Sequence, residues 1–153
     1  MTRFRLNRLY FAGMKSLIIC LLALPFLFAC NNNHKSTSSE NDVDAARNFL
    51  DAALDGKWND AKVFLVQDST NVQLLETVEN KYDHFPNSEK LNYMNASPIF
   101  HDSRKVNDSV TIISYSNSYT NRRDSLKIVR LNGQWLVDLK YTFFRTDSLG
   151  NVQ

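Results

Sequence analysis

The sequence has little cysteine and little histidine, which limits the chemistry open to it. Of its 153 residues, only two are Cys and three are His. Cys20 lies in an apolar run that we expect to be removed, so Cys30 is the only cysteine left in the mature chain. An intrachain disulfide is thereby excluded, and the fold has to rely on its core. With so few thiol and imidazole ligands, we predict no metal site and no cofactor.

The part of the chain that is expected to fold has no excess of basic residues. The first 29 residues hold four Arg or Lys side chains and no Asp or Glu, so 14 of the 18 basic residues remain against all 16 acidic ones. Nucleic-acid binding depends on clustered Lys and Arg at phosphates, so we predict no nucleic-acid partner. The same balance gives no attraction to anionic lipid, and membrane attachment would have to be covalent or apolar.

The sequence also lacks an apolar run long enough to span a bilayer. Residues 17–29 form a run of 13 apolar residues after a basic stretch, and Met14 with Lys15 offers a second start directly before it. A spanning helix needs roughly 20 residues, whereas a signal-peptide core has about this length. The sequence therefore predicts an export signal over residues 1–29.

The end of this run carries a short motif. Leu27-Phe28-Ala29-Cys30 resembles the lipobox of bacterial lipoproteins, although Phe28 is bulkier than usual at its position. The resemblance implies attachment of a diacylglyceryl group, which carries fatty-acyl chains such as palmitate, to the Cys30 thiol, and cleavage between Ala29 and Cys30. The alternative is an ordinary signal peptide that happens to contain a cysteine.

A polar segment follows Cys30. Residues 31–41 contain no apolar side chain, so residues 30–41 are expected to form a flexible tether. Two or more acyl chains hold a protein stably at a membrane. We therefore expect a lipid-anchored protein of the inner or outer membrane of a bacterial cell envelope, with its domain in the periplasm or at the cell surface.

Residues 42–146 show helical periodicity first and strand periodicity later. Apolar spacing predicts a helix from about Asp42, capped by Asn41 or Asp42, to Gly56. Further helices are predicted around 58–65, between a cap at Asp68 and Pro86, and more weakly over 87–95. Residues 147–153 are expected to be a loose tail.

After residue 96 the pattern changes to alternation. We predict strands over 97–106, 110–115, 126–131 and 135–143. Asn132-Gly133 is a strong hairpin turn signal before the last of these. Alternation there puts five apolar residues on one face, namely Trp135, Val137, Leu139, Tyr141 and Phe143. The predicted fold is α+β, with N-terminal helices on one face of a curved antiparallel sheet of about four strands.

Two segments resemble a known fold family. The stretch 49–61, with Gly56, Trp58 and Ala61, is similar to the opening of nuclear transport factor 2-like domains, and the hairpin 129–138 is similar to their last strand pair. In particular, the chain resembles small lipoproteins with an uncharacterised domain of this fold. The resemblance implies a cone-shaped α+β domain with a pocket between sheet and helices, but no particular activity. The candidate pocket residues are Tyr82, His84, Tyr93, Trp135 and Tyr141.

The first functional hypothesis is a non-catalytic binding or accessory module for a small ligand or another envelope protein. The alternative is an isomerase or dehydratase with its base among Asp83, His84, His101 and Asp102. His84 also fits a helix C-cap. His101, Asp102 and Ser103 cannot form a local triad, because adjacent strand residues point to opposite faces.

A third hypothesis is a structural subunit that forms a homodimer through its open sheet face. Tyr115 and Tyr119 are the side chains expected on that face. Arg122 and Arg123 lie in a polar loop between two predicted strands. They are interpreted as a solvated hairpin tip, with contact to an acidic partner as the alternative.

Overall fold

The computed structural model describes residues 38–145. The predicted signal, the lipobox with Cys30, most of the tether and the tail lie outside these residues. The chain divides into two units, Met1–Lys35 and Ser36–Gln153. The second unit contains the elements α2 (Asp42–Leu54), α3 (Trp58–Val63), α4 (Ser69–Asp83), α5 (Asn87–Met94), β1 (Pro98–Asn107), β2 (Val110–Asn117), β3 (Asp124–Leu131), β4 (Gln134–Asp138) and α6 (Leu139–Phe144).

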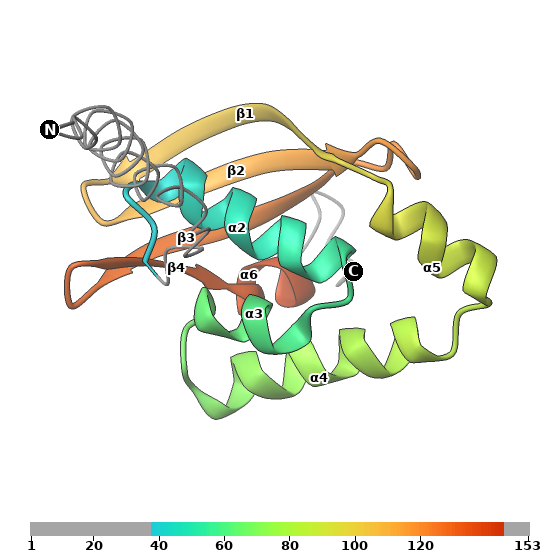
Figure 1. The fold of residues 1–153 in the computed structure, drawn as a ribbon. Coiled ribbons are helices and arrows are strands. Elements are labelled where there is room, and N and C mark those ends of the chain that lie inside the picture. Colours follow the sequence, from blue (N-terminus) through green and yellow to red (C-terminus); the bar gives the residue numbers. More distant parts are fainter. Residues whose placement is uncertain (1–37, 146–153) are drawn as a thin grey trace, which may run out of the picture. The chain divides into compact units, whose positions relative to one another are not determined.

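The four strands form one antiparallel sheet in the order β1-β2-β3-β4, so each strand pairs with its neighbour in the sequence. Helix α2 runs across one face of this sheet, and α3 and α4 lie below it (Figure 1). The α+β class and the four-stranded antiparallel sheet were predicted and are confirmed. Within residues 38–145, none of the helices has both the length and the apolar character that crossing a membrane requires.

Local signals explain where α2 begins and ends. The Asn41 side chain accepts a hydrogen bond of 3.0 Å from the Asp44 N–H and caps the helix, as predicted. Gly56 follows the helix with φ of +69°, a conformation that favours glycine. Ala52 of α2 and Ala61 of α3 are fully buried, and such small side chains let the two helices approach closely.

The core lies between the helices and the inner face of the sheet. On the strands, Ile113, Leu126, Ile128 and Val137 are buried, and they meet the buried apolar side chains of α2. The chain after α3 also joins the sheet, because Val137 donates to the Phe64 carbonyl at 2.8 Å and accepts from the Val66 N–H at 2.9 Å. Every described core residue belongs to Ser36–Gln153, so this unit carries a complete core and is the part used in the binding and stability experiments below.

The predicted last strand over 135–143 is wrong after Asp138. There the chain turns into helix α6, whose first turn is capped by the Asp138 side chain accepting from the Lys140 N–H. Leu139 and Phe143 are one helical turn apart and line the same cavity. The alternation from Trp135 to Phe143 fitted a strand, but the spacing of Leu139 and Phe143 also suits a short helix with one apolar face.

Gly56 and Gly133 allow a matched stability test. Both have positive φ, but a Cβ at Gly56 would lie 3.0 Å from Tyr82 Cε1, whereas one at Gly133 would meet nothing within 4 Å. We expect Gly133→Ala to cost about 1 kcal/mol for its backbone conformation, and Gly56→Ala to cost about 1 kcal/mol more, because Tyr82 must move. Urea unfolding measures both, and equal losses would contradict the packing of Tyr82 on Gly56.

Candidate functional site

A cavity of about 780 Å³ lies between the inner face of the sheet and the helices. Its walls come from α2, α4 and α6 on the helical side and from β2 and β3 on the sheet side. Single residues of α3, α5 and β1 also line it, as do Phe85 and three residues of the loop between β2 and β3. Its volume is in the range of pockets that hold small organic ligands.

Aromatic side chains form one wall of the cavity. The rings of Trp58 and Tyr82 meet edge to face with centroids 5.4 Å apart, and the rings of Phe85 and Tyr93 stack at 5.5 Å. Tyr82 and Tyr93 connect these two pairs at 6.3 Å. Helix α5 has no buried residue of its own, and it contacts the aromatic wall through the Tyr93 ring and through Lys90, whose Nζ lies 5.5 Å from the Tyr82 ring centroid. The wall offers flat apolar surface to a ligand.

The structure brings only part of the predicted pocket set together. Tyr82 and Tyr93 line the cavity, whereas His84, Trp135 and Tyr141 are not among the residues that do. Trp135 instead packs at the edge of the core, with the Arg130 guanidinium 5.7 Å from its ring centroid. Tyr141 is part of helix α6 and not of a strand, and its ring centroid lies 5.9 Å from the Arg145 guanidinium carbon.

The four candidate bases of the enzyme hypothesis do not reach the cavity. Asp83, His84, His101 and Asp102 all lie within residues 38–145, and none of them is on its wall. His84 is the C-cap of α4, with Nδ1 2.6 Å from the Asn80 carbonyl oxygen, so its interpretation as a cap is confirmed. His101 Nε2 lies 2.9 Å from Ser116 Oγ at a bulge in β1.

The sheet contributes a tyrosine and a carboxylate to the cavity wall. Tyr115 and Asp124 are directly opposite each other on β2 and β3. Burial raises the pKa of Tyr115, and the Asp124 charge raises it further, so the hydroxyl keeps its proton at neutral pH. Asp124 lies 3.6 Å from the Arg145 guanidinium and accepts a hydrogen bond of 2.7 Å from the Ser125 N–H.

Three basic side chains line the cavity, although the sequence analysis did not assign them to the pocket. Lys81 comes from α4, and Arg122 and Arg123 come from the loop between β2 and β3. None of the three forms an ion pair within residues 38–145. Arg122 and Arg123 were interpreted as a solvated hairpin tip, and only the folded sheet shows that this loop borders the cavity. The doubled arginine was the one available signal.

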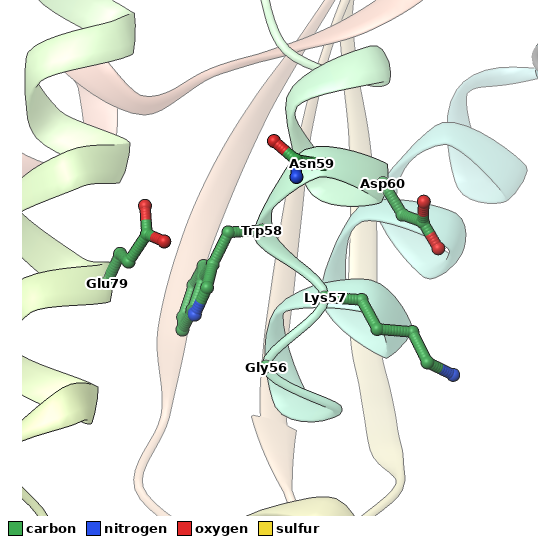
Figure 2. Close-up of a pocket in the computed structure, with 6 residues that line it drawn as sticks. All are labelled: Gly56, Lys57, Trp58, Asn59, Asp60 and Glu79. Atoms are coloured by element: carbon green, nitrogen blue, oxygen red, sulfur yellow. The ribbon is translucent and has the colours of Figure 1, made fainter.

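A second, smaller pocket of about 360 Å³ lies on the outer side of Trp58. Figure 2 shows Glu79 of α4 facing Trp58, whereas Lys57 and Asp60 extend to the opposite side. Lys57 Nζ forms an ion pair with Asp55 Oδ2 at 2.7 Å. The polar groups of this smaller pocket therefore do not converge on one point, and the larger cavity is the better candidate site.

The residues proposed for a dimer through the open sheet face are placed differently. Tyr115 lies on the helix-covered face and lines the cavity. Tyr119 is exposed in the loop after β2, where its ring meets Tyr93 edge to face at 5.1 Å. Both positions differ from the predicted placement of these side chains on the open sheet face. Tyr115 is two residues after the buried Ile113 on β2 and therefore points to the same side of the sheet, and Tyr119 lies beyond the end of the strand.

Neither a metal-binding group in the described residues nor a match to a known protein points to a particular function. Among residues 38–145, no group of three or more His, Cys, Asp or Glu side chains is arranged to hold a metal ion. No family model matches the chain, and no match was found among curated proteins or solved structures.

Proposed function

We propose that this chain is a lipid-anchored lipoprotein of a bacterial cell envelope whose domain, of the nuclear transport factor 2-like fold, binds a small apolar ligand without transforming it. The lipobox resemblance at Cys30 supports the anchor, and the helix-covered antiparallel sheet is compatible with that fold. The observation that carries the binding role is the cavity of about 780 Å³ with its aromatic wall.

The cavity has the composition of a binding site rather than of a packing defect. Apolar side chains from α2, α4 and α6 line it, together with polar groups that include Tyr115, Asn117 and Arg122. Small-molecule sites combine a mainly apolar lining with a small number of placed polar groups. An apolar ligand would exchange water for the surfaces of Tyr82, Phe85 and Tyr93, and the area removed from water would drive binding.

Binding is tested with a neutral fluorescent probe, phenylnaphthylamine, titrated into the unit Ser36–Gln153. We expect saturable fluorescence enhancement, and we expect Val78→Trp to weaken it at least about ten-fold, because an added ring fills space that the ligand needs. Val72→Trp is the matched control. It lies on the same helix and is also partly buried, but it is outside the cavity wall. No saturable binding, or equal binding by the two variants, would refute the proposal.

One observation favours the isomerase or dehydratase as a second candidate: Asp124 and Tyr115 lie side by side on the cavity wall. A carboxylate base with a tyrosine as oxyanion donor is the pairing that such chemistry uses. However, Asp124 is occupied by Arg145 and by the Ser125 N–H, and both contacts compete with a substrate proton for its lone pairs. We therefore favour the binding module. A homodimer through the open sheet face stays a prediction.

A further inference from the structure

We propose that the cavity selects anionic amphiphiles, which are molecules with an apolar body and one terminal oxyanion group that is bound by Arg122, Tyr93 and Tyr115. This inference rests on the proposed binding function and names the ligand class of the same cavity. It starts from the charges on the wall. Lys81, Arg122 and Arg123 stand there against a single carboxylate, that of Asp124.

These three cations form no ion pair within residues 38–145, whereas Lys140 pairs with Asp68 at 2.7 Å and Lys127 with Asp138 at 3.2 Å. Exposed cations such as Arg104 also lack an ion pair, but they do not line the cavity. Asp124 is itself paired with Arg145, which leaves the charges of the cavity cations uncompensated. In a domain with more acidic than basic residues, the wall of the cavity is thus a local positive region that attracts anions.

The loop that carries Arg122 is held in place. The Asn117 side chain accepts hydrogen bonds from the Tyr119 and Thr120 N–H groups at 3.1 and 2.9 Å, and the Asn121 N–H donates to the Asn117 carbonyl at 2.9 Å. Ser118 is tied to Ser97 ahead of β1 by two further hydrogen bonds of 3.0 Å. An arginine on a braced loop loses less conformational entropy on binding than one on a loose loop.

Two phenol groups lie near the Arg122 charge. Tyr115 pairs with Asp124, two residues after Arg122, across β2 and β3, and the Tyr93 ring meets Tyr119 of the loop that carries Arg122 at 5.1 Å, so both phenols border that loop. Burial raises the pKa of both Tyr93 and Tyr115. Both hydroxyls therefore stay protonated at neutral pH. Neither makes a hydrogen bond to another residue in the described part of the chain, so both are available as donors.

Together these groups match an oxyanion. A guanidinium offers several N–H donors in a fixed plane, and the two phenol groups add O–H donors. Phe85, Tyr82 and the α2 side chains line the same cavity and offer apolar surface for the rest of the molecule. The three donors therefore bind the charged end, and the aromatic wall accepts the apolar body.

The test compares two probes that differ by one charged group, anilinonaphthalene sulfonate and the neutral phenylnaphthylamine, on Ser36–Gln153. We expect the sulfonate to bind about ten-fold more tightly, with this preference lost in 1 M salt, where charges are screened beyond about 3 Å. Arg122→Gln should weaken sulfonate binding about ten-fold and neutral binding less than about two-fold. Tyr115→Phe should weaken sulfonate binding alone.

Arg104→Gln is the matched control, because Arg104 is exposed on β1 and does not line the cavity. It should change neither affinity by more than about two-fold. If the neutral probe binds as tightly as the sulfonate, or if Arg104→Gln acts as strongly as Arg122→Gln, the anion inference is overturned while the binding function stands. If neither probe binds, both proposals fail together.

Discussion

In bacterial cells fed a fatty-acid probe, Cys30→Ser is expected to abolish labelling of this chain and to remove it from the fraction of processed, membrane-held protein. The physical reason is that the acyl chains are attached to one thiol, for which a hydroxyl is no substitute. Each buried methylene contributes about 0.8 kcal/mol to membrane binding, so two or more chains hold the protein stably and none leaves only the polar tether. The expected change is therefore close to all or nothing.

The matched control for this experiment is Cys20→Ser. Cys20 lies within the apolar run, so its replacement should leave labelling and processing intact. Labelling that survives Cys30→Ser, or a mature N-terminus found at a residue other than Cys30, would end the anchoring proposal. The outcome is independent of the cavity, because it concerns only where the chain is held.

Replacing Asn71 by Ala is expected to lower the free energy of unfolding by about 2 to 4 kcal/mol, the largest loss that we predict for a single polar side chain. Asn71 is fully buried. Its Oδ1 accepts from the Leu139 N–H at 2.8 Å, and its Nδ2 donates to Asp68 at 2.9 Å and to Asp138 at 3.3 Å. The amide thus joins the start of α4 to the junction of β4 and α6.

Truncation would leave one buried group without a partner and would remove one of the donors of another. The Leu139 N–H would lose its acceptor, and the Asp138 carboxylate would lose a donor in a mostly buried place. Unsatisfied buried groups carry their full desolvation cost, and the missing side chain leaves a small void. Lys140 still holds Asp68 at 2.7 Å; in the intact protein the hydrogen bonds from Lys140 and from Asn71 together lower the pKa of this carboxyl to about 2.

Urea and thermal unfolding of Ser36–Gln153 would measure the effect, with a fall in Tm of roughly 10 °C or more for a domain of this size. Asn80→Ala is the control, because it makes the same substitution at an exposed position of the same helix, and it should change stability by less than about 0.5 kcal/mol. A loss at Asn71 as small as the loss at Asn80 would contradict the network.

Much of the fold was predictable because local patterns and packing agree. Apolar spacing, the Asn41 cap and the positive φ of Gly56 all point to α2 and its end, and α2 begins at the predicted residue. The Asn132-Gly133 turn lies between two paired strands, as expected. At these places the conformation of each residue depends mainly on residues a few positions away in the chain, and the sequence shows those residues directly.

The exception at β4 shows where such reasoning stops. A period of two over 135–143 predicted a strand, but the Leu139 N–H is taken by Asn71, which lies 68 residues earlier, and Asp138 caps a helix. The pattern of Leu139 and Phe143 fits either structure. The choice between them was made by a partner distant in the sequence.

The sequence by itself shows the apolar run over 17–29 and the lipobox-like motif at Cys30, and it predicted the order of helices and strands as far as Asp138. Only the tertiary structure decided what lines the cavity. Tyr93, Tyr115 and Arg122 come from α5, β2 and a loop, and nothing in their spacing links them. Periodicity reports which face of one element is buried, whereas a site depends on which faces of different elements meet.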